Sequence, residues 1–160
     1  MIRRLLPVFL LLTVFTFAAQ AQKKTPEQKA TKKATNISKY INSKITDKAQ
    51  HLTATQTASI KTAYVEFYAD KKALREKKKK FRTDVKEFKA QAKKPQSAEN
   101  IAKLKEMKKQ LIADKKAMSK EAKEMRTRRE DKITEALNAT QKVHFKAMRA
   151  EQAAKRANQK

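Results

Sequence analysis

The sequence predicts an all-α protein of four helices, in which two long central helices run antiparallel as a thin hairpin. The chain of 160 residues contains no glycine and no cysteine. Glycine is the favoured residue of tight hairpin turns and helix C-caps, so its absence disfavours a sheet. Apolar residues also recur at three- and four-residue spacing along much of the chain, which is typical of amphipathic helices.

The first 21 residues have the pattern of an export signal that is cleaved after Ala21. Arg3 and Arg4 precede an almost wholly apolar run over 5–19, and small residues stand at Ala19 and Ala21. An uncleaved membrane anchor is the alternative. The apolar run of about 15 residues is shorter than the roughly 20 that a spanning helix needs. We therefore expect a protein that crosses the inner membrane and resides in the periplasm.

The exported chain is strongly basic and poor in bulky apolar residues. The full sequence has 41 Lys and Arg against 16 Asp and Glu, a net charge of +25, and only two arginines leave with the signal, which leaves +23. Leu, Ile, Val and Phe make up about 14% of residues 22–160, below the roughly 20% under which a highly charged chain is suspected of disorder. Two outcomes remain open. The chain is partly disordered, or its helices pair along narrow stripes that a second subunit completes.

The first two helices follow a short polar segment. Residues 22–29 are expected to be flexible, and the helical domain is expected to span 30–150. Its first helix carries a stripe from Ala30 to Ile45 and should end near residues 47–51. The second, over about 54–92, has an apolar stripe that Lys71 and Lys78 interrupt where a coiled coil would prefer Leu or Ile.

The last two helices begin at recognisable caps. Pro95 marks a turn, and Ser97 is a good N-cap for a third helix that continues to about Leu137. Lysines again stand at intervals in its stripe. A fourth helix starts at Ala139, and residues 151–160 have little to bury, so we expect a frayed basic tail.

One five-residue pattern occurs twice, 85 positions apart: Leu-Thr-Ala-Thr-Gln and Leu-Asn-Ala-Thr-Gln. Each copy predicts a helix start with a capping box. The side chain of the N-cap residue accepts a hydrogen bond from the backbone N–H of the third helical residue, and the glutamine side chain at that third position accepts one from the N-cap backbone N–H. The leucine before each cap should anchor the corner in the core. The structural motif therefore comprises Leu52, Thr53, Gln56, Leu137, Asn138 and Gln141.

These two motifs, behind an export signal in a small basic helical chain, resemble the Leu-Thr-x-x-Gln signature of the Spy/CpxP family of periplasmic proteins. The first copy matches fully, and Asn138 replaces threonine in the second. The resemblance covers most of residues 30–150. It implies a thin antiparallel protomer, a cradle-shaped homodimer, and an ATP-independent chaperone or envelope-stress activity.

The leading functional hypothesis is a chaperone that holds unfolded or acidic client proteins. The positive field attracts the client, and apolar side chains within the basic surface hold it loosely. The candidate client-binding residues are cations and apolar residues of the two long helices: Arg75, Lys78, Phe81, Arg82, Phe88, Met118, Met125, Arg126 and Arg129. For each of them the plain alternative is a core or solvated surface role.

A second hypothesis is a helical protein that binds polyanions or anionic lipids of the envelope. The charge alone would give a steep dependence on salt, with no preference for unfolded proteins. Nucleic acid would bind only non-specifically, since the export signal argues against a cytoplasmic target.

Metal sensing and catalysis have weaker support. His51 and His144 are the two histidines, no cysteine is present, and no metal site or cofactor is expected. Without glycine the chain lacks the phosphate-binding and nucleophile-elbow motifs. We therefore expect no enzyme activity.

Overall fold

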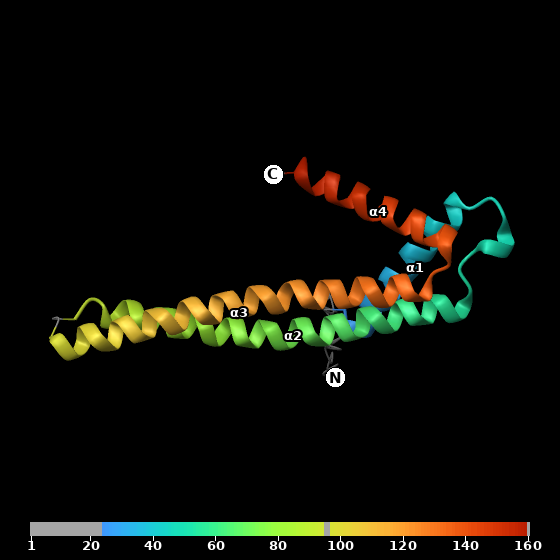
Figure 1. Cartoon of the computed structure of the whole chain (residues 1–160). Coiled ribbons are helices and arrows are strands. Elements are labelled where there is room, and N and C mark those ends of the chain that lie inside the picture. The colour runs from blue at the N-terminus through green and yellow to red at the C-terminus, as the bar shows by residue number, and fades with distance from the viewer. Residues whose placement is uncertain (1–23, 95–96, 160) are drawn as a thin grey trace, which may run out of the picture.

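The computed structural model describes residues 24–94 and 97–159, and this part of the chain is all α-helical, as the sequence predicts (Figure 1). The expected export signal, its cleavage site and the turn at Pro95 lie outside the described residues. The elements in chain order are α1 (Pro26–Lys44), the short 3-10 helix η1 (Lys48–Gln50), α2 (Ala54–Gln91), α3 (Ala98–Ala136) and α4 (Ala139–Ala157).

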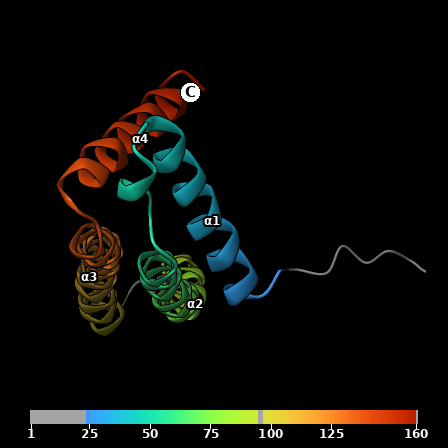
Figure 2. The same cartoon turned by 90° about the vertical axis from the view of Figure 1, so that its right-hand side faces the viewer.

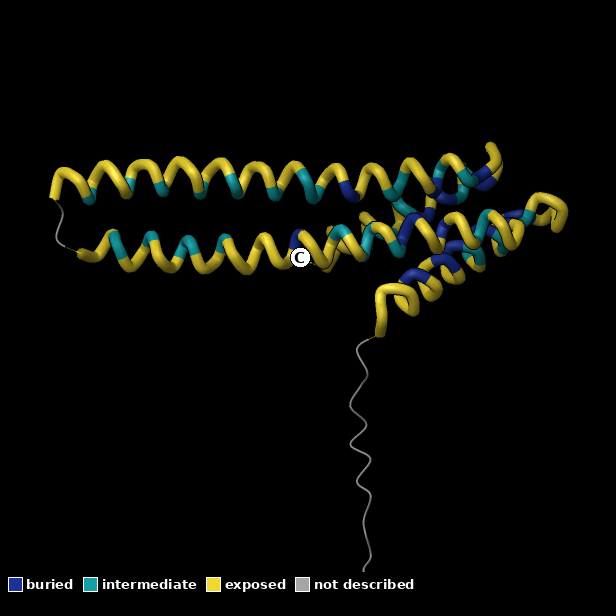
Figure 3. Tube along the Cα trace, turned by 90° about the horizontal axis from the view of Figure 1, so that it is seen from below, coloured by how far each residue is buried: buried dark blue, intermediate teal, exposed yellow. Residues whose placement is uncertain are grey.

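Helices α2 and α3 form the predicted hairpin. They contain 38 and 39 residues and pack side by side along their length (Figure 1). At 1.5 Å per residue each is about 57 Å long. Figure 3 shows that the outer half of the hairpin buries little, with half-buried residues along the inner edge of each helix. Two paired helices cannot enclose their apolar stripes fully, because no third helix covers the seam between them.

The core lies at the other end of the hairpin, where α1 packs on α2 and α4 packs on α1 (Figure 3). Its most enclosed apolar side chains include Ile41, Ile60 and Ile133, which come from three different helices. Figure 2 shows α1 and α4 standing over one side of the hairpin, with α4 leaning away from it. This splayed arrangement leaves a hollow between the hairpin and the two short helices.

The corners at this end form without glycine. No described residue has a positive φ, and α1 and α3 each end at an extended apolar residue, Ile45 and Leu137. Both predicted capping boxes are present, at Thr53 with Gln56 and at Asn138 with its glutamine. The leucines before the caps, Leu52 and Leu137, are buried in the core, as predicted.

The two repeated motifs also contact each other, which the sequence analysis did not predict. Gln56 Nε2 donates to Gln141 Oε1 at 3.0 Å, and Gln141 Nε2 donates to Gln56 Oε1 at 3.3 Å. Each amide further donates to a carbonyl oxygen at 2.9 Å, of Ala136 and Gln50 respectively. Gln141 is only 1% exposed, so these bonds satisfy a polar group inside the core. This glutamine pair ties the α1–α2 corner to the α3–α4 corner.

Two helices extend into segments that were expected to be flexible or frayed. Helix α1 begins at Pro26, inside the segment 22–29 expected to be flexible, because Thr25 and Gln28 form a third capping box. Helix α4 continues to Ala157 rather than fraying after residue 150. The Tyr40 hydroxyl donates to Glu151 at 2.6 Å and so gives the early part of this segment a contact with α1.

Candidate functional site

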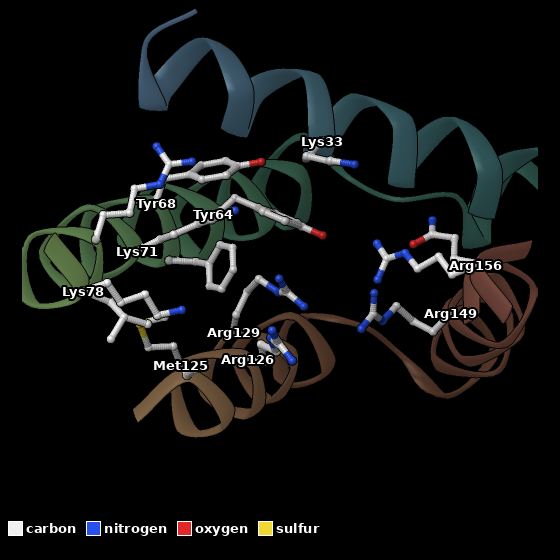
Figure 4. A pocket seen from close by; sticks show the side chains of 15 residues that line it. Lys33, Tyr64, Tyr68, Lys71, Lys78, Met125, Arg126, Arg129, Arg149 and Arg156 are labelled. Atoms are coloured by element: carbon white, nitrogen blue, oxygen red, sulfur yellow. The ribbon is translucent and has the colours of Figure 1, made fainter. Parts of the chain in front are cut away.

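A basic groove of about 660 Å³ lies between the hairpin and the two short helices (Figure 4). Side chains from all four α-helices line this groove, and it is open because α4 leans away from the hairpin. Its lining comprises Lys33 from α1, Tyr64, Phe67, Tyr68, Lys71, Leu74, Arg75 and Lys78 from α2, Ala122, Met125, Arg126 and Arg129 from α3, and Arg149, Gln152 and Arg156 from α4.

Three aromatic rings form one wall of the groove. Tyr64, Phe67 and Tyr68 share a face of α2 because they stand at i, i+3 and i+4, and their ring centroids lie 5.6 to 6.5 Å apart. The Arg129 guanidinium packs against this wall, 4.5 Å from the Phe67 centroid and 5.2 Å from that of Tyr64. Such cation–π contacts hold a charge in place where it is partly withdrawn from water.

Arg129 is the most enclosed cation of the groove. Its side chain is 9% exposed, its Nη2 donates to Glu130 at 3.0 Å, and its Nε has no hydrogen-bond partner among the described residues. Arg149 from α4 pairs with the same Glu130 carboxylate. One acid is thus shared between two arginines of different helices.

The groove has a large excess of positive charge. Eight of its lining side chains are Lys or Arg, and none is Asp or Glu. Apart from Arg129 and Arg149, none of these cations forms an ion pair with another described residue. Mutual repulsion of this kind costs free energy unless an anion compensates it.

The crowding of cations affects their ionisation. The pKa of Lys71 is lowered, first by burial and then by repulsion from Arg75, Arg126, Lys29 and Arg129. The pKa of Tyr64 is raised by burial, although Arg129 and Arg149 oppose the shift. Burial and the positive potential both lower the pKa of Lys71, whereas for Tyr64 the effect of burial outweighs the opposing effect of the arginines.

A second, smaller hollow of about 380 Å³ adjoins the groove along the hairpin. It shares Lys78 and Ala122 with the groove and is lined in addition by Phe81, Arg82, Lys115, Met118 and Ser119. It alternates cations with apolar surface, as the groove does. The two hollows together form a continuous basic and apolar track on the α2–α3 hairpin.

The structure brings most of the predicted client-binding residues onto this track. Arg75, Lys78, Met125, Arg126 and Arg129 line the groove, and Phe81, Arg82 and Met118 line the second hollow. Phe88 lies half-buried about 10 Å farther along α2 than Phe81 and borders neither hollow. Met125 is buried, so it packs behind the surface of the groove and offers little accessible area to a ligand.

Several lining residues were missed from the sequence. Tyr64, Phe67 and Tyr68 are not among the predicted site residues, although their i, i+3, i+4 spacing beside Lys71 offered a signal. Arg149 and Arg156 of α4 stand seven residues apart, on one helical face. Their part in the site depends on how α4 folds back at its corner, for which the sequence holds no local signal.

The residues considered for a metal do not converge. His51 Nε2 lies 2.9 Å from the carbonyl oxygen of Ile45 at the α1–α2 corner, and His144 is on α4. Within residues 24–94 and 97–159, no three His, Asp or Glu side chains gather as metal ligands would. No helix in the same part of the chain is long and apolar enough to cross a membrane.

Comparison of the chain with protein-family models, with curated proteins and with solved structures gave no match.

Proposed function

We propose that the protein is an ATP-independent chaperone that holds unfolded, preferentially acidic segments of client proteins along the track of groove and second hollow. The observation that carries the proposal is the groove itself, in which eight cations surround an aromatic wall and no acidic residue lines the surface. Cations attract an acidic chain at long range, and half-buried aromatic and apolar surface retains its side chains at contact.

The shape of the site suits an extended and variable ligand. The groove and the second hollow are open and share lining residues, so a chain segment can lie along them without threading. Long Lys, Arg and Met side chains adapt to different sequences at modest cost. A track of this kind favours loose, promiscuous binding over a single tight complex.

The proposal extends to family, location and assembly. Two capping boxes at the corners of a basic helical hairpin support membership of a Spy/CpxP-like family in the periplasm. A cradle-like homodimer would cover the apolar side chains that the outer hairpin leaves half-buried, among them Val85, Phe88, Leu104 and Leu111. Sedimentation of the purified protein measures this assembly directly.

The test is suppression of client aggregation by light scattering. The double variant Arg75→Gln/Arg126→Gln removes two exposed cations of the groove. We expect it to protect a denatured acidic client several-fold less well than the parent protein. A denatured basic client of similar size should gain little protection from either form.

The matched control is Lys105→Gln/Lys116→Gln, which removes two exposed lysines of α3 that line neither hollow. This control has the same net charge as the groove variant but leaves the groove intact. If the groove binds the client, the control should retain the parent's activity. Equal losses of protection in the two variants would mean that net charge alone, and not the groove, accounts for the activity. A parent protein that protects no client at low salt would refute the proposal outright.

A further inference from the structure

The head of the basic groove, where α3, α4 and the aromatic wall meet, contains arginines with unused donors. Arg75, Arg126 and Arg156 come from three different helices, and none forms an ion pair with another described residue. Figure 4 shows Arg126 and Arg129 extending from α3 and Arg149 and Arg156 from α4 into one space. A guanidinium presents a planar fork of donors that matches phosphate or carboxylate oxygens.

Arg129 adds an observation that is independent of surface charge. Its side chain is more than nine-tenths buried against Tyr64 and Phe67, yet its Nε has no partner among the described residues. Burying an arginine without satisfying its donors is costly, and such groups are uncommon outside functional sites. The aromatic wall therefore holds one cation in a fixed position, and the more exposed cations surround it.

The ratio of charge to volume indicates the class of ligand. Eight cations face about 660 Å³, and the nearest compensation is the single Glu130 carboxylate that Arg129 and Arg149 share. A carboxylate brings one negative charge, whereas a terminal phosphoryl group brings about 1.5 to 2 and three acceptor oxygens, and each internal group of a chain adds one more charge. In so small a space, linked phosphoryl groups supply matching charge more readily than a short acidic peptide does.

We propose that the head of the groove is a specific site for a compact ligand with clustered phosphoryl groups, such as a short polyphosphate. The site would use the free arginines of α2, α3 and α4 as oxygen ligands, with Arg129 fixed behind them. This inference concerns the same groove as client binding but does not depend on it. A bound oligophosphate would also occupy the place proposed for an acidic client.

Calorimetric titration of the purified protein with inorganic triphosphate at about 150 mM salt tests the site, because screening at that ionic strength removes most diffuse attraction. We expect saturable binding of one triphosphate per chain. Citrate, a tricarboxylate, should bind at least about tenfold more weakly, a difference of about 1.4 kcal/mol. Unsaturable binding, or equal affinity for citrate, would overturn the proposal.

Variants locate the site. Arg126→Gln/Arg156→Gln removes two exposed arginines without disturbing a described ion pair and should weaken triphosphate binding roughly tenfold or more. Lys105→Gln/Lys116→Gln should bind as the parent does. If both variants lose affinity equally, the ligand senses net charge and no site exists. Should the arginine variant fail to fold, as judged by circular dichroism, the triphosphate and citrate comparison on the parent still decides.

Two further arms separate the source of the phosphate and the two proposed functions. Phosphatidylglycerol vesicles carry phosphodiesters with one charge each and should bind parent and arginine variant alike. Binding of vesicles through these arginines, without triphosphate binding, would assign the groove to a lipid surface and refute the proposal. Client protection is measured with phosphate absent, so its failure leaves the triphosphate result unaffected.

Discussion

At the scale of single residues, Gln141 is the side chain on which the corners depend most. Its amide closes a capping box, bonds Gln56 and bonds the Gln50 carbonyl from a position that is 1% exposed. We expect Gln141→Ala to lower the free energy of unfolding by about 2 kcal/mol or more, because it leaves buried partners without hydrogen bonds. Urea denaturation followed by circular dichroism measures the loss.

The neighbouring Thr140 provides the control, since it is exposed in the same turn of α4. Thr140→Ala should change stability by less than about 0.5 kcal/mol, and Thr53→Ala, which removes only a cap, should cost about 1 kcal/mol. The double variant of Gln56 and Gln141 to Ala should cost less than the sum of the two single changes. Strict additivity would show that the two amides do not act as a pair.

At the scale of elements, α4 depends on α1 for its position. It leans away from the hairpin, and the Tyr40 hydroxyl of α1 donates to Glu151 of α4 at 2.6 Å (Figure 2). The pKa of Tyr40 is raised by this hydrogen bond, then by burial and by the Glu151 charge. Because the folded pKa exceeds the unfolded value of about 10, the contact contributes fully below pH 10 and is lost as pH rises through the folded pKa.

The variant Tyr40→Phe tests this contact. Its urea midpoint should lie below that of the parent at about pH 8, where the phenol is neutral, and the difference should be smaller at about pH 11, above the unfolded pKa of about 10. A difference of the same size at both pH values would mean that the ring, and not the hydroxyl bond, stabilises the contact. Tyr68 is not altered in this variant, so the burial that raises its pKa affects both proteins equally.

At the scale of the whole molecule, salt should act in opposite directions on stability and on binding. The chain carries a net charge of +25, and its ion pairs lie mostly on exposed surfaces. Screening relieves the self-repulsion, so the melting temperature should rise between about 50 and 300 mM salt. Protection of an acidic client should fall over the same range.

Thermal unfolding and light scattering on one preparation make this comparison. If both quantities fell with salt, attractive ion pairs would dominate the fold. If protection were insensitive to salt, apolar contact alone would retain the client, and the cations of the groove would need another explanation.

How far the sequence predicts this molecule depends on whether a feature is local. Capping boxes, helix periods and the buried leucines at 52 and 137 arise from residues a few positions apart, and these predictions agree with the structure. Arg75, Arg126 and Arg129 were predicted as cations of the two long helices, and packing of α2 on α3 brings them to one groove.

The remainder depends on the angles at the corners. No local pattern predicts the contact of Gln56 with Gln141, or the position of Arg149 and Arg156 in the groove. Each of them requires α4 to fold back onto residues that are distant in the sequence. The helical start at Pro26 has a local signal of its own, because proline suits the first position of a helix. Thr25 and Gln28 form the same capping box as the repeated motif but lack its leucine.

The glutamine pair also has a consequence for the order in which the chain folds. The α2–α3 hairpin can zip from its turn, where the partners are close in sequence, whereas the pair joins positions 85 residues apart at the opposite end. Contacts that close long loops form late, because the loss of chain entropy on closing the loop comes before the contact stabilises the structure. The hairpin should therefore precede the groove during folding, so the chain acquires its long helices well before the surface proposed for binding.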